Sequence, residues 1–255
     1  MWNVCHHVHW LPLLLFAVLA TTFIITYSIA VSQKHVYAFW PYISDTGALP
    51  PESCVFSLLL NIASMITMVI IYIRHVQVSE YTRLRSYINI HRGWNITSSV
   101  IAYMGILGLL FVANFQETNQ FAIHIIGAIM CFVLITIYFL IQCVFTYKMQ
   151  CASKLIFWLR VLFTCINAIS FIMTFSPIGE AIKRHKGKNK LYWTPKDGGY
   201  EYHLISTISE WILVLSFCLY VSTFYWEFKK FHFMPCEMRV RVRRYSDFLR
   251  VLFSF

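Results

Sequence analysis

The sequence predicts an all-α polytopic membrane protein, a bundle of six transmembrane helices joined by short loops. Of its 255 residues, 58% are hydrophobic and 13% are charged, whereas a soluble domain carries about 25% charged residues. Six apolar stretches with few ionisable residues each reach the length of about 20 residues that a helix needs to cross a bilayer. Buried helices of a soluble protein would each need a polar stripe, and these stretches show none.

The six predicted spans follow one another along the chain. They comprise residues 11–31, 54–73, 94–115, 121–145, 157–178 and 203–226. The first stretch is longer than the apolar core of a signal peptide, which has about 7–15 residues, and no Lys or Arg precedes it. We therefore expect a retained helix. We predict a single membrane domain over residues 1–255, in which residues 227–255 form a basic cytosolic tail.

The third and fourth spans are predicted to form an antiparallel hairpin, because only residues 116–120 join them. Gly105 and Gly108 lie on the third span, and Gly127 is followed by Ala128 on the fourth. Small residues of this kind allow the backbones of two membrane helices to approach closely. We therefore expect tight packing within this hairpin.

The distribution of basic residues predicts that both termini are cytosolic. Short cytosolic loops are enriched in Lys and Arg. With a cytosolic amino terminus, most of the 21 basic residues lie on the cytosolic side, including Arg74 and Arg160. The lysine-rich loop at residues 179–202 falls on the opposite side and does not fit this rule.

Glu210 is an ionisable residue within the sixth span, and such residues are by default functional hypotheses. It lies about 10 Å deeper along the helix than His203. His203, Ser206 and Glu210 share one helix face, which must point into the bundle because lipid cannot satisfy it. Two interpretations stay open. These residues form either a protonatable or ligand-binding site, or interhelical hydrogen bonds worth about 1 kcal/mol or less each.

Several polar residues are predicted to gather at the luminal face of the membrane. The cluster that we hypothesise there comprises Asp45, Glu52, His124, His203 and Glu210. Histidines and carboxylates together are typical of hydrolytic metal sites. However, the chain has no His-x-x-x-His pair on these spans, and no two candidate ligands share a helical turn. We predict no catalytic residue, no metal and no cofactor.

The carboxyl-terminal tail carries two short motifs. Arg239, Arg241, Arg243 and Arg244 form a basic cluster that would contact anionic lipids, at about 1 kcal/mol per residue, unless it serves only as the orientation signal. Tyr245-Ser246-Asp247-Phe248 fits a sorting signal in which Tyr245 and Phe248 enter two pockets of a sorting adaptor. The basic surplus lies mostly beside the membrane, so we expect no nucleic-acid partner.

Motifs in order along nearly the whole chain resemble those of the DNA-damage-regulated autophagy modulator (DRAM) family of six-span membrane proteins. The matching segments are Pro41-Tyr42-Ile43-Ser44-Asp45-Thr46-Gly47, Pro51-Glu52, Val112-Ala113-Asn114-Phe115-Gln116-Glu117, His124, Gly127-Ala128, Trp193-Thr194-Pro195, Tyr200, Tyr202-His203 and Glu210-Trp211. The resemblance implies a non-enzymatic protein of the lysosomal or late endosomal membrane that promotes or modulates autophagy. It supplies no catalytic residues and no known autophagy partner.

The alternative is a lipid-handling or GPI-anchor-related membrane protein that uses the luminal polar face. The wider superfamily shares the Pro-Tyr-Ile-Ser and Asn-Phe-Gln elements, and it includes proteins linked to GPI-anchor processing and lipid asymmetry. A bound lipid headgroup would favour this alternative, and unchanged lipid profiles in a knockout would oppose it. A transporter needs a polar path through the whole bundle, but polar residues lie mainly in one leaflet.

Overall fold

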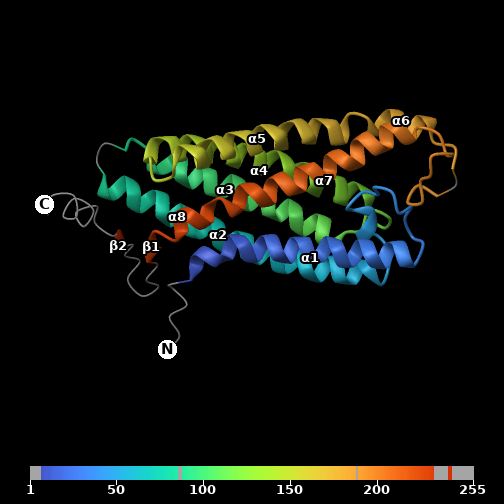
Figure 1. Cartoon of the computed structure of the whole chain (residues 1–255), viewed down its shortest axis with the longest axis horizontal. Coiled ribbons are helices and arrows are strands. Elements are labelled where there is room, and N and C mark those ends of the chain that lie inside the picture. Colours follow the sequence, from blue (N-terminus) through green and yellow to red (C-terminus); the bar gives the residue numbers. More distant parts are fainter. Residues whose placement is uncertain (1–6, 86–87, 188, 233–240, 243–255) are drawn as a thin grey trace, which may run out of the picture.

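Six long helices lie side by side along the long axis of the molecule in a computed structural model (Figure 1). The structure describes residues 7–85, 88–187, 189–232 and 241–242. The long helices are α1 (Leu11–Ser32), α2 (Glu52–Leu84), α3 (Arg92–Asn114), α4 (Phe121–Met149), α5 (Lys154–Phe175) and α7 (Tyr200–Ser222). Within the described residues, 6 helical segments are long and apolar enough to cross a membrane. The predicted all-α, six-helix fold is therefore confirmed.

Short elements complete the described chain. They are η2 (Val8–Trp10), η3 (Asp45–Gly47), α6 (Ile178–Arg184), α8 (Phe224–Phe228), and the antiparallel pair β1 (Phe231–His232) and β2 (Arg241–Val242). Two of the helices depart from the predicted limits. The second long helix, α2, continues well past residue 73, and α6 forms inside the predicted fifth loop. Polar residues lower hydropathy without breaking a helix, so hydropathy alone places these ends too early.

The bundle has two distinct ends. The first described residues and the end of α8 lie at one end, which we call the terminal end (Figure 1). Residues 33–51 and 185–199 lie at the other end, which we call the loop end. An even number of membrane crossings places both termini of the bundle on one side. The opposite side is then covered by the two longest connections.

The α3–α4 hairpin packs at backbone distance, as its small residues predict. A Cβ atom added to Gly108 would lie 2.5 Å from the carbonyl oxygen of Gly127. A Cβ added to Gly127 would lie 2.7 Å from the carbonyl oxygen of Gly108. Real Cβ contacts are not this short, so both positions need glycine. Dispersion contacts between the close backbones replace the hydrophobic driving force that is missing within lipid.

The interior of the bundle is apolar at its centre, and its outer surface is also apolar. Leu15, Ile106 and Phe139 are almost completely buried in the core. Large apolar side chains such as Leu58 and Trp158 are exposed on the outside. A soluble monomer rarely exposes broad apolar surface, so this outer surface is suited to lipid rather than to water.

The first loop, residues 33–51, folds back into the loop end of the bundle. Asp45 is 4% exposed and Thr46 is completely buried. The hydroxyl of Thr46 lies 3.2 Å from that of Thr26 on α1. Gly47 packs directly on the ring of Phe56, because an added Cβ would lie 2.4 Å from that ring. The loop is therefore an ordered plug, as its turn residues predict.

Candidate functional site

Glu210 on α7 holds the first loop in place. Its Oε2 accepts a hydrogen bond of 2.7 Å from the backbone nitrogen of Ile43. The neighbouring Trp211 donates from Nε1 to the carbonyl of Pro41 at 2.9 Å. Both bonds join α7 to the segment that contains the Pro-Tyr-Ile-Ser-Asp-Thr-Gly string. Glu210 therefore serves at least as an anchor, which is the hydrogen-bonding interpretation of its position.

The predicted polar face of the sixth span does point into the bundle. His203, Ser206 and Glu210 are all buried. Ser206 donates a hydrogen bond from its hydroxyl to the carbonyl of Thr174 on α5. The ring of His203 stacks on Trp193 with centroids 4.4 Å apart, and it meets the edge of Tyr42 at 5.1 Å. The three residues thus connect α7 with α5, the fifth loop and the first loop.

The turn that presents Trp193 is formed by the segment from Trp193 to Gly199. The backbone nitrogen and hydroxyl of Thr194 both donate to Asp197 at 2.7 Å. These bonds lower the pKa of the Asp197 carboxyl, because they favour its ionised form. Gly198 and Gly199 have φ angles of 77° and 64°, which suit glycine. The two glycines and the Asp197 side chain thus fix the conformation of the turn.

A cavity of about 450 Å³ lies beside Glu210 at the loop end, and we call it the lateral cavity. Its polar wall contains Asp45, Glu117, His124, Lys190 and Glu210. Its apolar wall comes from α4, α5 and α6. That wall includes Phe121, Ile125, Ala128, Phe132, Phe175, Ile178 and Ile182. The cavity is therefore amphipathic, with carboxyl groups on one side and hydrocarbon on the other.

Asp45 is the more deeply buried of the two carboxyl groups of the lateral cavity that lie outside the long helices; the other is Glu117. Burial raises its pKa well above the usual range, and the charges of Glu117 and Glu210 raise it further. The physical cause is that a buried carboxylate beside other carboxylates loses hydration and gains repulsion. His124 donates from Nδ1 to the carbonyl of Phe115 at 2.8 Å, which holds its ring at the cavity wall.

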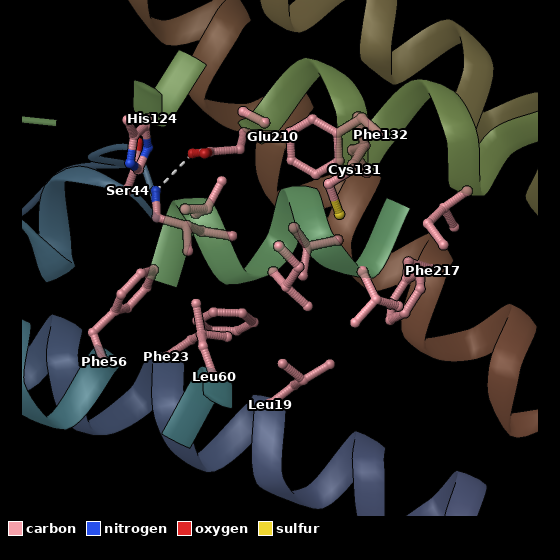
Figure 2. Close-up of a pocket in the computed structure, with 18 of the residues that line it drawn as sticks. Leu19, Phe23, Ser44, Phe56, Leu60, His124, Cys131, Phe132, Glu210 and Phe217 are labelled. Carbon is pink, nitrogen blue, oxygen red and sulfur yellow. Dashed lines mark hydrogen bonds between the residues drawn. The ribbon is translucent and has the colours of Figure 1, made fainter. Parts of the chain in front are cut away.

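A second, smaller cavity of about 80 Å³ lies in the centre of the bundle. Figure 2 shows Glu210 and His124 at one end of it, with apolar side chains such as Leu19 and Phe217 around the rest. Ser44, His124, Ala128, Phe132 and Glu210 line both cavities. The shared residues Ser44, His124 and Glu210 therefore lie between a mainly apolar central cavity and the larger lateral cavity.

The five residues of the predicted luminal cluster do not form one group. Asp45, His124 and Glu210 line the lateral cavity together. His203 is taken up by its stack with Trp193. Glu52 is completely buried at the start of α2 and pairs with His35 instead. A shared membrane depth thus places residues at one end of the bundle, but helix rotation decides which of them meet.

A buried ionic cluster at the terminal end was not expected from the sequence. It joins α2, α5 and α8, and its members Arg74, Arg160 and Glu227 are all completely buried. Glu227 Oε2 accepts from Arg74 Nη1 and from Arg160 Nη2, each at 2.8 Å. The orientation argument places both arginines on the cytosolic side of the membrane, and the structure adds that their side chains are buried within the bundle.

Neutral side chains also bind this ionic cluster. Two of them accept hydrogen bonds from the arginines, and one donates to Glu227. Arg74 Nε donates to Gln142 at 2.8 Å, and Arg160 Nε donates to Thr223 at 2.8 Å. Cys151 donates from its thiol to Glu227 Oε1 at 3.0 Å. Burial beside Glu227 raises the pKa of the Cys151 thiol to about 12. The sequence does contain a signal for this cluster, because Arg74, Arg160 and Glu227 lie at the ends of three predicted spans. Basic residues at such positions are usually assigned to loops.

The predicted tail motifs cannot be placed on the structure. Arg239, Arg243, Arg244, Tyr245 and Phe248 lie outside the described residues. Arg241 belongs to β2, of which only the backbone is described. Among the residues that the structure describes, no group of three or more His, Cys, Asp or Glu side chains could hold a metal ion.

The fold and the site define a multi-pass membrane protein whose first loop plugs one end of the helix bundle and is held there by a buried carboxyl group. Residues 7–231 match the family described as the Frag1/DRAM/Sfk1/Cwh43P N-terminal domain. The chain belongs to this family.

The relatives are similar over most of their length. DNA damage-regulated autophagy modulator protein 2 of Homo sapiens is 34% identical over 235 residues, which cover 90% of this chain and 87% of that protein. DNA damage-regulated autophagy modulator protein 1 of Homo sapiens is 33% identical, over 86% of this chain and 90% of that protein. Modulator of macroautophagy TMEM150B-B of Xenopus laevis is 35% identical over 49% of this chain and 52% of that protein. No solved structure matches the chain.

Proposed function

We propose that this protein modulates autophagy from the membrane of lysosomes or late endosomes, without enzymatic activity. Two observations support this proposal. The chain belongs to the family, and relatives that are named autophagy modulators align with up to 90% of its length. Those names refer to autophagy and not to lipids or GPI anchors, so they favour this function over the lipid-handling alternative.

Loss of the gene product tests the proposal. We expect reduced autophagic flux in cells that lack the protein, measured as the lysosome-dependent turnover of an autophagosome marker. Wild-type protein should restore the flux. Unchanged flux in cells that lack the protein and its relatives, together with an altered lipid or GPI-anchor profile, would instead favour the alternative.

The tail supports the proposed location. The distribution of basic residues favours a cytosolic tail, where Tyr245 and Phe248 would meet a sorting adaptor. A Tyr245→Ala variant should shift from lysosomes to the cell surface, as seen by surface labelling of the full-length protein. Ser246→Ala is the matched control, because it leaves both anchor residues of the motif intact. Equal distributions of the two variants would contradict the sorting signal.

The basic cluster of the tail is proposed to contact anionic lipids. Arg239, Arg241, Arg243 and Arg244 lie close behind the last helix. Each basic residue near an anionic leaflet contributes about 1 kcal/mol of attraction, which salt screens. Substituting all four with Gln should weaken the binding of a tail peptide to vesicles that contain phosphatidylserine. No difference at low salt would assign the cluster to membrane orientation alone.

A further inference from the structure

The lateral cavity contains three carboxyl groups that have no cationic partner. The ion pairs within the described residues involve Glu52, Glu80, Glu180 and Glu227. None involves Asp45, Glu117 or Glu210. Asp45 is 4% exposed and Glu210 is 8% exposed, so water solvates these two groups poorly. Buried carboxylates are normally paired or bound to a cation.

Glu210 has a backbone partner, whereas the hydrogen-bond partner of the Asp45 carboxyl is another carboxyl group, that of Glu117. One oxygen of Glu210 is bound to the backbone of Ile43. The polar neighbours of the Asp45 carboxyl are the carboxyls of Glu117 and Glu210, which disfavour its charge. Asp45 lines the lateral cavity and is almost completely buried. This arrangement disfavours the ionised form of Asp45 and keeps it protonated, unless a positive group enters the cavity and stabilises the carboxylate.

Much of the cavity lining is hydrocarbon, and part of this lining is exposed on the outside of the bundle. Phe121 on α4 is 57% exposed, and Ile182 on α6 is 42% exposed, and both line the cavity. On a membrane helix, exposed apolar side chains face lipid. The apolar lining from α4 and α6 is therefore accessible from the outer surface of the bundle. Its volume of about 450 Å³ falls within the range of about 300–1,000 Å³ that is usual for ligand sites.

We propose that the lateral cavity binds a membrane amphiphile with a primary ammonium headgroup. The ammonium group would lie among Asp45, Glu117 and Glu210, and the first carbon atoms of the chain would lie against Ile125, Phe132 and Ile182. The site does not depend on the proposed role in autophagy. Two sources supply this chemistry: a phospholipid with an amine headgroup, and a long-chain amine without phosphate.

Lys190 distinguishes the two sources. It lines the same cavity as the three carboxyl groups and is exposed. A phosphate group next to the ammonium would lie within the attraction of the Lys190 side chain, whereas a phosphate-free amine would gain nothing from it. A Lys190→Gln variant should therefore weaken the binding of the phospholipid and leave the binding of the long-chain amine unchanged or improved.

The test measures lipid binding to the purified full-length protein by native mass spectrometry. The probes are phosphatidylethanolamine, sphingosine, phosphatidic acid and diacylglycerol with matched chains. Phosphatidylethanolamine or sphingosine should bind at least about ten-fold more tightly than both phosphatidic acid and diacylglycerol, which lack the amine. This difference corresponds to about 1.4 kcal/mol. Equal binding of diacylglycerol or phosphatidic acid would overturn the proposal.

Paired variants separate the site from the general lipid surface. Glu117→Gln removes one cavity carboxyl from a half-buried loop position, whereas Glu201→Gln removes an exposed carboxyl outside the cavity. Ile125→Trp fills the cavity, whereas Ile126→Trp changes a neighbouring residue that is 55% exposed. We expect the affinity for the ammonium probes to fall about ten-fold in Glu117→Gln and in Ile125→Trp. In the two controls it should fall less than about two-fold.

These variants keep the proposal testable even if one of them fails to fold. Monodispersity and the thermal midpoint check each purified variant. Because the two cavity variants act through charge and through volume, either one alone reports on the site. Folded Glu117→Gln and Ile125→Trp proteins that bind the ammonium probes as tightly as wild type would overturn the proposal. Unchanged autophagic flux in cells that lack the protein, together with tight binding of the ammonium probes by the wild type, would contradict only the function proposed above.

Discussion

At the scale of single residues, Glu227 decides whether two buried arginines are tolerated. Among the ion pairs of the described residues, Arg74 and Arg160 pair only with Glu227. We expect Glu227→Gln to lower the free energy of unfolding by about 3–5 kcal/mol, because removing one partner leaves charges buried without compensation. Titration with a denaturing detergent, followed by the helical signal, measures this change.

The matched control for Glu227 is Glu80→Gln. Glu80 also binds an arginine, but the side chain of Arg83 is 63% exposed. Exposed ion pairs contribute about 0–1 kcal/mol. If the two variants unfold at similar detergent concentrations, the buried cluster does not carry the stability that its geometry indicates.

Asp45 predicts a pH dependence of stability. Its pKa is raised in the folded protein, so the fold holds a proton that the unfolded chain releases above about pH 3.9. The resulting contribution to the stability of the fold is fully present below that pH. It is lost as the pH rises through the pKa of Asp45 in the folded protein. The groups that face Asp45 across the cavity are Glu117, His124, Lys190 and Glu210.

We therefore expect the wild-type protein to lose thermal stability as the pH rises from about 4 through the raised pKa of Asp45, and Asp45→Asn to flatten this dependence. Unfolding midpoints of both proteins across this range measure the effect. Parallel curves for the two proteins would show that Asp45 does not titrate with a raised pKa. A protein with this behaviour would be most stable in an acidic compartment.

At the scale of elements, the α3–α4 hairpin depends on its glycines. In Gly108→Ala the new methyl group would lie 2.5 Å from the carbonyl oxygen of Gly127, so the helices must separate. We expect a loss of about 1–3 kcal/mol in the free energy of unfolding, as is usual for overpacked sites.

Gly179→Ala is the control for the hairpin substitution. No atom lies within 4 Å of a Cβ added at Gly179, which lies on α6. Alanine has the higher helix propensity, so this variant should be neutral or slightly stabilising. A similar loss in both variants would mean that α3 and α4 do not approach as closely as the structure shows.

At the scale of the whole molecule, the six crossings lead us to predict that both termini lie on one side of the membrane. The start of α1 and the end of α8 lie at the terminal end (Figure 1). Epitope tags on the two termini should therefore become accessible to antibodies together when only the plasma membrane is permeabilised. Accessibility of one tag without the other would contradict six crossings.

The sequence alone determined the six-helix bundle, the close hairpin and the inward polar face of α7. These features follow from local composition, because 18 or more apolar residues have few stable alternatives to a membrane helix. The order of the first loop agrees with its Pro and Gly residues, which restrict the backbone. Most helix ends agree within a few residues, apart from α2, where polar residues continue the helix.

Only the tertiary structure decided which polar groups meet. Asp45 and Glu210 share a cavity, while Glu52 at a similar depth turns toward His35. Arg74, Arg160 and Glu227 come from three helices that are far apart in sequence, and their meeting depends on helix rotation and register. Hydropathy constrains the depth of a residue within the membrane but not its direction around the helix axis. The direction is set by the packing of all the helices together.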